Sequence, residues 1–387
     1  MAQGLPLFPL AGKGNAAVKH GVLVYYGKKA YKNIGDYIQS VAAAQYAGHD
    51  AQRMDRENLD RYGGDPVKVV MNGWFMYNPK RFPPSDRVVP LFASFHLNPN
   101  IEGRFFTDEV VAYLKAREPI GCRSTDVVEM MSRHGIKAEF SSCLTLTLGE
   151  TFHHEEADTP PVFVDPVFPR VRRRDGVLRL LARFLLRLPF MLVHAKDIAR
   201  LLPRFNAFVE FRKVGLSPVS WMQGAVRVLY AAEFLRAYTP LFGKDVLFSA
   251  EYISHNVSRK ECPDEDALFA KAEALLHRYE KAPFVVTSRL HCTLPCLAMG
   301  TPVWTVIGSS MKNGRFGGNE DFINPLSLGK NGFVASPESI ASPDGKIHLD
   351  ARPPVRTDHV PFAERLREKV RVFFTEANAL SQEGVMS

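Results

Sequence analysis

Residues 283–308 read PFVVTSRLHCTLPCLAMGTPVWTVIG, which predicts a strand, a helix and a second strand in immediate succession. The segments 283–288 and 301–308 are short apolar runs rich in Val. The stretch between them, 289–300, is apolar and ends at a Gly, as helices often do. This succession predicts an α/β protein in which helices cover a parallel sheet.

The same alternation runs through both halves of the chain. Residues 21–27 are predicted to form a strand and residues 34–48 a helix. Further strands are predicted over 67–74, 88–96, 118–124, 137–148 and 244–254, and further helices over 107–117, 125–135, 264–282 and 362–380. Two α/β units with a basic insert between them predict a cleft at their interface, where ligands usually bind.

Charge is concentrated in one stretch of the chain. The 387 residues hold 49 Lys and Arg against 41 Asp and Glu, a formal net charge of +8. Residues 170–204 contain ten of the basic residues and only two acidic ones, so the remaining chain is neutral overall. This stretch lacks Tyr and Trp and has a continuous apolar face, which argues against a nucleic-acid partner.

The cysteines and the apolar runs bear on the compartment. Five Cys without a CxxC pair argue against a disulfide framework or a zinc ribbon and favour a reducing compartment. The start, MAQGLPLFPLAGKG, lacks the pattern of a signal peptide, and no apolar run is long enough for a transmembrane helix. We therefore expect a cytoplasmic protein. Cys292 and Cys296 are expected to be buried core residues of their helix.

The first strand-to-helix turn carries Asn33, Gly35, Asp36 and Gln39. Gly35 would allow a backbone to approach closely, and Asp36 and Gln39 lie about a turn apart at the start of the helix. The same pattern suits an ordinary helix N-terminus, with Asp36 complementing the helix dipole. The turn is therefore either a binding site or an ordinary helix start.

Two later turns place cationic side chains at predicted helix starts. Arg123 ends a strand directly before a Ser/Thr helix cap, and Arg289 and His291 stand two residues apart before an apolar helix. Arg side chains and the free N–H groups of a helix N-terminus bind phosphate and carboxylate groups. Although an exposed Arg is usually solvated and a lone His is usually structural, the set predicts a cleft that binds a small polyanion.

At these residues the chain resembles the polysaccharide pyruvyl transferase family. The similar segments are, in order, NIGDYIQSVAA (33–43), MNGW (71–74), PIGCRST (119–125), SSCLTLTLGETF (141–152), EYISH (251–255), VVTSRLHCTLPCLAMGTPV (285–303) and RFGG (315–318). The resemblance implies transfer of pyruvate from phosphoenolpyruvate to a sugar as a cyclic ketal. It also implies a GT-B-like fold, in which two Rossmann-like domains face a cleft.

The resemblance implies a division of the chain into four parts. These are an N-terminal Rossmann-like domain on the acceptor side over 1–165, a basic amphipathic helical insert over 166–205, a C-terminal Rossmann-like domain on the donor side over 206–360, and a closing helix in 361–387.

The donor site implied by the resemblance contains several cationic groups. Arg289 and His291 should contact phosphoenolpyruvate, with Arg123 as a second clamp across the cleft and Arg315, in a Gly-rich loop, as a further candidate. The phosphate and the carboxylate of this donor both suit bidentate Arg contacts. Phosphoenolpyruvate is the expected co-substrate, and no cofactor is expected.

The implied chemistry needs a general acid, a base for the sugar hydroxyls and cations for the departing phosphate. His291 is the candidate acid or phosphate partner, and Asp36 is the candidate base. The acceptor, a glycan or a lipid-linked glycan, is expected to contact Asn33, Asp36, Gln39 and Asn72.

Two features limit what the resemblance implies. Ser124 stands where family members often have an acidic residue, which puts any role of that acid in doubt. No metal site is expected, because the run His153-His154-Glu155-Glu156 lacks the spacing of a zinc-binding helix.

Residues 171–205 predict an amphipathic helix that is broken at Pro189 and resumes as far as Leu202. Leucines recur every three and four residues with Phe184 beside them, and Arg179, Arg183 and Arg187 recur every four. Such a helix can lie in a membrane interface, or it can pack on its own domain with its arginines over apolar surface. Because an acceptor on a lipid carrier would lie at the inner face of the membrane, we predict peripheral attachment there.

Two other functions stay open. A nucleotide-sugar glycosyltransferase could use the same GT-B-like fold, but it would need an acidic residue near the Gly300-Thr301-Pro302 turn, and residues 303–308 contain none. A catalytically inactive glycan-binding relative is the non-enzymatic alternative. The complete set of two arginines and one histidine argues against it.

Overall fold

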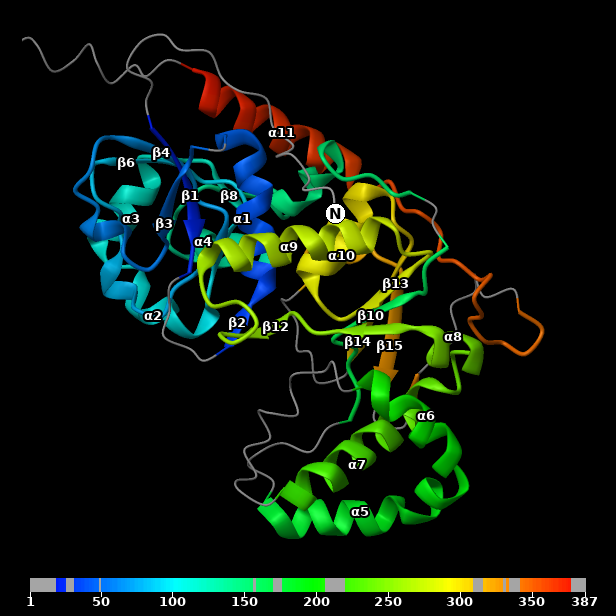
Figure 1. Ribbon diagram of the computed structural model, residues 1–387. Coiled ribbons are helices and arrows are strands. Elements are labelled where there is room, and N and C mark those ends of the chain that lie inside the picture. The colour runs from blue at the N-terminus through cyan, green and yellow to red at the C-terminus, as the bar shows by residue number, and fades with distance from the viewer. Residues whose placement is uncertain are drawn as a thin grey trace, which may run out of the picture.

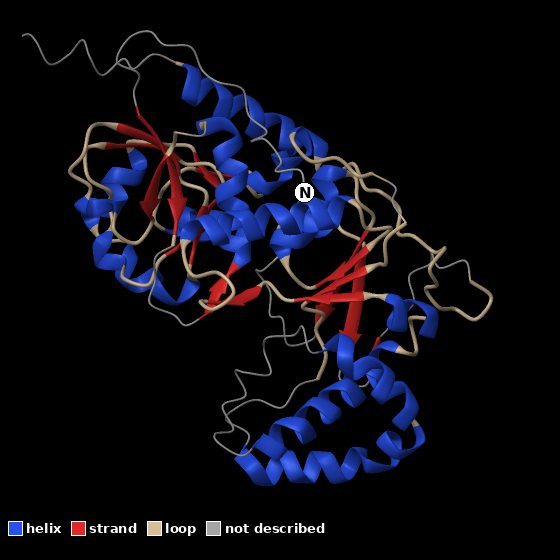
Figure 2. Ribbon diagram, in the orientation of Figure 1, coloured by secondary structure: helices blue, strands red, loops and turns tan. Residues whose placement is uncertain are grey.

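The computed structural model describes most of the chain, and helices alternate with strands along it (Figures 1 and 2). The described residues are 19–25, 31–48, 50–155, 158–169, 176–205, 220–308, 316–329, 332–333 and 342–376. In the three larger sheets all strand pairs are parallel except one at an edge. The predicted α/β class with parallel sheets is therefore confirmed.

The N-terminal part contains two parallel sheets of four strands each. The first runs in the order β3 (Gln52–Asp55), β1 (Lys19–Val24), β4 (Val67–Val70) and β6 (Val88–Leu91). The second runs in the order β5 (Gly73–Phe75), β7 (Phe95–Leu97), β8 (Ile120–Cys122) and β9 (Ala138–Phe140).

The single strands predicted over 67–74 and 88–96 are wrong in one respect, because each is divided between these two sheets. The first becomes β4 and β5, and the second becomes β6 and β7. Ser94, between β6 and β7, has a φ of 65°, a left-handed conformation that interrupts extended backbone.

The C-terminal part contains a six-stranded sheet. Its order is β11 (Glu251–Ile253), β10 (Val162–Val164), β13 (Val285–Thr287), β14 (Val303–Gly308), β15 (Pro325–Gly329) and β16 (Gly332–Phe333). Strand β13, helix α10 (Leu290–Met299) and strand β14 are the predicted strand–helix–strand unit, and the two strands are parallel neighbours. Strand β10 precedes the insert in the chain, yet it pairs with β11 and β13, which follow the insert.

Two predicted strands are partly helical. Residues 244–254 begin as helix α8 (Lys244–Ser249) and form β11 only afterwards; Gly243 occupies the N-cap, and Asp245 complements the dipole in the first turn. Residues 137–148 form β9 and then enter a 3-10 helix over Leu144–Glu150. Ser142, with a φ of 60°, separates these two elements.

The remaining predicted helices are confirmed. They are α1 (Ile34–Ala47), α3 (Asp108–Lys115), α4 (Thr125–Arg133), α9 (Glu265–Glu280) and α11 (Val360–Thr375). Side chains of Thr107 and Asp264 accept backbone N–H groups in the first turns of α3 and α9, which explains where these helices begin. Connections contain the short α2 (Glu102–Phe105) and 3-10 helices at Leu59–Arg61, Pro79–Arg81, Pro99–Ile101 and Glu320–Phe322.

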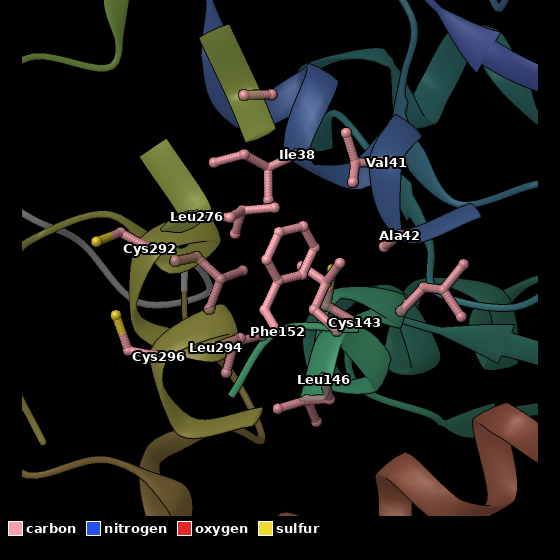
Figure 3. Packing of buried hydrophobic residues seen from close by; sticks show 14 of the residues in the cluster. Ile38, Val41, Ala42, Cys143, Leu146, Phe152, Leu276, Cys292, Leu294 and Cys296 are labelled. Atoms are coloured by element: carbon pink, nitrogen blue, oxygen red, sulfur yellow. The ribbon is translucent and has the colours of Figure 1, made fainter. Parts of the chain in front are cut away.

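One buried apolar core joins the two parts of the chain. Figure 3 shows side chains from α1, from the Leu144–Glu150 3-10 helix, from α9 and from α10 packed together, with Phe152 among them. A Cβ at Gly149 would overlap the carbonyl oxygen of Ala298 in α10, so only Gly permits this approach. Each large side chain in this core contributes roughly 1.5–3 kcal/mol, and together they fix α10 against the N-terminal part.

The five cysteines are free and buried, so the prediction that Cys292 and Cys296 are core residues is confirmed. Beside the same core, strands β2 (Tyr31–Asn33) and β12 (Asn256–Ser258) pair antiparallel. This second contact also joins the N-terminal and C-terminal parts.

The basic insert forms α5 (Gly176–Val193) and α6 (Ala195–Phe205), which pack on α7 (Ser220–Tyr238) at one edge of the molecule (Figure 1). The predicted break at Pro189 is wrong, because α5 continues through it. Pro189 is exposed, so water can satisfy the carbonyl group that its missing N–H leaves without a partner.

The arginines of α5 do not all face solvent. Arg183 and Arg187 donate from Nε to Oε1 of Glu233 at 2.8 and 2.9 Å, and Arg236 donates from Nε to Oε2 at 3.2 Å. Glu233, on α7, is completely buried. Phe184 packs on the core of these helices. Most leucines of α5 are exposed, whereas Leu180 is buried in that core.

The Glu233→Gln variant keeps the shape of this cluster and removes its negative charge. Burial disfavours the charged carboxylate, but hydrogen bonds from Arg183 and Arg187 outweigh burial and lower the pKa of Glu233. The stabilisation is therefore present above the ordinary carboxyl pKa and is lost as the pH falls through the folded pKa. Near neutral pH we expect the free energy of unfolding, measured in urea, to fall by about 3 kcal/mol.

The matched control is Glu364→Gln, on the exposed side of α11, which should change the free energy of unfolding by no more than about 0.5 kcal/mol. The difference between Glu233→Gln and wild type should shrink in acid. Equal losses in the two variants, or a loss that does not depend on pH, would contradict the prediction.

Candidate anion-binding cavity

A cavity of about 420 Å³ lies where turns from the two parts of the chain meet. Its volume suits a small-molecule ligand. Its walls include cationic groups from Arg56, Arg123 and Arg289, and the imidazoles of His96, His255 and His291. Asp36 and Asp126 also line it, and Trp74 and Tyr77 form an aromatic wall.

The structure brings together five of the residues that the sequence singles out. Asn33, Asp36, Arg123, Arg289 and His291 all line the cavity, although they come from three separate turns. Arg123 directly follows β8, Arg289 is the N-cap of α10, and Asn33 is the N-cap of α1. Arg123 and Arg289 each follow a strand of a parallel sheet, although the two strands belong to different sheets, and Asn33 ends β2, which pairs antiparallel with β12. Three strand-to-helix turns from three sheets therefore meet at the cavity.

A direct contact between the two parts of the chain joins Arg123 to His291 in the cavity. Nη1 of Arg123 lies 3.4 Å from Nε2 of His291. Because a guanidinium can only donate, Nε2 accepts and the ring proton of a neutral His291 is on Nδ1. A Cβ at Gly35 would stand 2.9 Å from that Nδ1, so the start of α1 packs directly on His291. Gly at this position leaves room for the imidazole.

Arg123 is a buried cation. Only 6% of the residue is exposed, and burial lowers its pKa. Its Nε finds no hydrogen-bond acceptor among the described residues. A buried charge with an unsatisfied donor is unfavourable unless an anion pairs with it. Arg123 therefore favours occupation of the cavity by an anionic ligand.

Arg289 is held by Asp165, which the sequence analysis missed. Nε of Arg289 donates to Oδ2 of Asp165 at 2.7 Å, and the backbone N–H of His255 donates to the same oxygen at 2.9 Å. Burial opposes ionisation of Asp165, but the charge of Arg289 outweighs it and the pKa is lowered. Asp165 directly follows the buried strand β10, and its position next to the end of β13 could be found only from the strand order.

His96 is a second residue that the sequence analysis missed. It lies in β7 and lines the cavity, and its Nδ1 lies 3.1 Å from Oγ of Ser124. Burial and then the charge of Arg123 lower the pKa of His96 well below its usual value. His96 is therefore neutral near neutral pH, and it adds no second positive charge beside Arg123.

The start of α1 fits both interpretations of its sequence. Asn33, not Asp36, caps the helix, because its side chain accepts the N–H of Gly35 at 3.2 Å. Oδ1 of Asp36 lies 3.3 Å from Nη1 of Arg56, a cation that the sequence analysis did not single out. Since Asn33 and Asp36 also line the cavity, the turn is a helix start and a wall of the site together.

The other predicted site residues lie elsewhere. Gln39 and Asn72 are buried behind the cavity wall, where Nδ2 of Asn72 donates to the backbone oxygen of Gln39 at 2.8 Å. Arg315 lies outside the described residues. Within the described residues, no group of three or more His, Cys, Asp or Glu side chains is arranged to hold a metal ion.

Comparison with known proteins gives one finding. The family model described as polysaccharide pyruvyl transferase matches residues 33–310, which is most of the chain. That span contains every cavity residue named above and the helices of the insert. No curated protein and no solved structure matches the chain.

Replacing Asp165 with Asn should loosen Arg289. The substitution removes the negative charge from a pair whose carboxylate is buried and whose guanidinium is partly exposed. We expect a loss of about 2 kcal/mol in the free energy of unfolding, measured by thermal unfolding, because removal of one partner leaves the other charge poorly solvated.

The control for this variant is Asp358→Asn, which breaks the exposed Arg356–Asp358 pair of similar length, 2.8 Å. That variant should unfold within about 0.5 kcal/mol of wild type. An Asp165→Asn protein as stable as the control would show that the pair does not anchor Arg289.

Proposed function

The chain belongs to the polysaccharide pyruvyl transferase family, and from this premise we propose that it transfers pyruvate from phosphoenolpyruvate to a sugar as a cyclic ketal and releases phosphate. The acceptor in this proposal belongs to a cell-envelope or exopolysaccharide glycan or to its lipid-linked precursor. The observation that carries the proposal is the convergence of Arg123, Arg289 and His291 on one cavity.

The charge distribution of the cavity supports an anionic donor. Phosphoenolpyruvate carries a carboxylate at one end of a three-carbon unit and a phosphate on the central carbon, and guanidinium groups bind both in bidentate geometry. Arg123 comes from the N-terminal part and Arg289 from the C-terminal part. In the proposal these two side chains clamp the donor from opposite sides, and Asp165 positions Arg289.

The proposed reaction forms one C–H bond and then two C–O bonds. Protonation of the methylene carbon of phosphoenolpyruvate produces the methyl group and an oxocarbenium-like centre at the neighbouring carbon. A sugar hydroxyl attacks that carbon and gives up its proton, and a second hydroxyl of the same sugar then displaces phosphate and closes the ketal. The proton lost by each hydroxyl goes to a base, and phosphate takes the electron pair of the C–O bond that breaks.

The residues of the cavity can take these roles in the proposal. His291, which lies between Arg123 and the start of α1, is the proposed acid or phosphate partner. As the acid it would have to carry a second proton, on Nε2, and the negative charge of the bound donor would favour that protonation. Asp36 accepts the hydroxyl proton, because its carboxylate lines the cavity on the acceptor side. The arginines stabilise the departing phosphate dianion through charge-assisted hydrogen bonds.

The alternatives receive less support. A nucleotide-sugar glycosyltransferase would need an acidic residue near the turn at Gly300, and residues 303–308 contain none. An inactive glycan-binding relative would have no use for a buried arginine that lacks a partner at Nε.

We also propose that α5 attaches the protein to an anionic lipid surface. One side of this helix carries Leu178, Leu185 and Leu192, which are 83%, 67% and 69% exposed. Leu181 and Leu188 lie on the same side of the helix and are exposed as well. Exposed apolar strips of this kind mark interaction surfaces.

Charge argues for lipid as the partner of this strip. Arg179 on α5 and Lys196 and Arg200 on α6 are exposed, and each basic residue near an anionic bilayer contributes roughly 1 kcal/mol. None of the helices among the described residues is both long and apolar enough to cross a membrane. In the proposal α5 therefore lies in the interface, where a lipid-linked acceptor would be available.

Isothermal titration tests the donor site. Phosphoenolpyruvate should bind wild-type protein, and Arg123→Ala and Arg289→Ala should each weaken binding about tenfold or more, because a hydrogen bond to a charged group contributes roughly 1.5–3 kcal/mol. The control, Arg104→Ala, changes an exposed arginine on α2 and should bind as wild type does.

UDP-glucose is the competing titrant. If UDP-glucose gives heat of binding and phosphoenolpyruvate gives none, the pyruvyl transfer proposal is wrong and the chain is a glycosyltransferase instead. Binding of phosphoenolpyruvate without any consumption in the presence of candidate glycans would favour the inactive relative. Because Arg289→Ala leaves Asp165 without its cation, Arg123→Ala decides the outcome if the first variant is unstable.

Sedimentation with vesicles tests the membrane proposal. Wild-type protein should sediment with phosphatidylglycerol-containing vesicles, less so at high salt, and Leu178→Ser/Leu185→Ser/Leu192→Ser should abolish sedimentation. The control is Leu349→Ser/Val355→Ser, which changes two exposed apolar residues elsewhere. Unchanged sedimentation of the triple variant, or none for wild type, would refute the proposal.

A further inference from the structure

Part of the cavity wall is aromatic. Trp74, in β5, and Tyr77, just after it, both line the cavity. Their ring centroids are 4.7 Å apart with an interplanar angle of 59°, and the ring of Tyr25 lies 5.5 Å from that of Tyr77. Tyr77 is 48% exposed, so this pair is accessible to a ligand.

The aromatic pair is held in place from behind. Cζ of Arg56 lies 4.7 Å from the centroid of the Tyr25 ring and 5.8 Å from that of Trp74. Oε2 of Glu57 accepts the backbone N–H of Tyr77 at 2.8 Å. Arg56 is itself buried, with 5% exposed. The rings are therefore pre-organised, which lowers the entropy that a ligand would lose on binding.

A continuous series of contacts connects the aromatic pair to the donor residues. Arg56 contacts Trp74 and also pairs with Asp36 at 3.3 Å. Asp36 follows Gly35, and the α-carbon of Gly35 faces the imidazole of His291. A ligand on the aromatic pair would therefore lie beside the proposed base and close to the group that binds the donor.

The chemistry of the rings selects the ligand. The face of an aromatic ring carries partial negative charge and disfavours an anion, so phosphoenolpyruvate is expected beside Arg123 and Arg289. A pyranose has C–H groups on its ring faces, which pack on aromatic rings, and hydroxyls around its rim, which need polar partners. Asp36 and Arg56, which line the same cavity, supply such partners.

We propose that Trp74 and Tyr77 form the acceptor subsite, on which a pyranose ring stacks with its hydroxyls toward Asp36. This inference rests on the proposed function for the identity of the reaction, while stacking itself can be measured without turnover. It assigns to these two residues the selection of the sugar ring, which is separate from donor binding.

Saturation-transfer difference NMR on the full chain tests the subsite. The probe is methyl β-D-galactopyranoside, which offers free hydroxyl pairs of the kind that a ketal bridges. Irradiation of aromatic protein protons should transfer saturation to the ring C–H protons of the glycoside. Trp74→Ala and Tyr77→Ala should lose most of this signal, Trp74→Phe should keep part of it, and Tyr62→Ala, away from the cavity, should keep all of it.

Affinity for phosphoenolpyruvate provides the second readout. It should stay within about twofold of wild type in the Trp74 and Tyr77 variants, whereas the apparent affinity for the glycoside should fall about tenfold. A Trp74→Ala protein that no longer binds phosphoenolpyruvate is misfolded, and Trp74→Phe and Tyr77→Ala then decide the test.

The outcomes separate this inference from the proposed function. No saturation transfer to the glycoside in wild type, or equal saturation transfer in wild type and the Trp74→Ala and Tyr77→Ala variants, would overturn the acceptor subsite. Transfer to uridine monophosphate that Trp74→Ala removes, with none to the glycoside, would make the rings a nucleobase site instead. Stacking of the glycoside without any binding of phosphoenolpyruvate would leave the subsite in place and reject the pyruvyl donor.

Discussion

The packing of α10 on α1 and on the Leu144–Glu150 3-10 helix is the contact on which the site depends. Because α10 begins at the carboxyl end of β13, its position decides where Arg289 and His291 lie. The buried core and the close approach at Gly149 hold that helix against the N-terminal part. His291 is thereby placed 3.4 Å from Arg123, which precedes it by 168 residues. Without this contact Arg289, His291 and Arg123 would not share a cavity.

Electrostatics explains why these side chains favour an anion. Arg289 has a carboxylate partner in Asp165, whereas Arg123 is buried beside neutral His96, and its Nε has no acceptor among the described residues. A site in which positive charge is fixed before the ligand arrives does not have to reorganise when negative charge develops on a departing group. Burial of the Arg123 charge lowers the stability of the folded protein, and the apolar core shared by the two parts offsets this loss.

A buried charge also decides the orientation of α5 in the insert. A single buried carboxylate, Glu233, attracts Arg183 and Arg187 to the inner side of α5. Those arginines share the inner side of α5 with Leu180 and Met191, and leucines such as Leu178, Leu185 and Leu192 lie on the outer side. Sequence periodicity shows that α5 has two sides, but it does not show which side is buried, because Glu233 is about fifty residues away in the chain.

The sequence by itself determined the α/β class, most helix boundaries and the candidate cations, because hydrophobic periodicity, capping residues and strand ends are local signals. It also placed Asn33, Asp36, Arg123, Arg289 and His291 at strand-to-helix turns. These turns follow strands of three different sheets, so the packing of the sheets brings them to one cavity. Only the tertiary structure decided that two predicted strands are divided between sheets and that Gln39 and Asn72 do not line the cavity. It also decided that Arg56 and the aromatic pair line the cavity and that Asp165 holds Arg289. These facts depend on strand order and on contacts between distant segments, which no local pattern encodes.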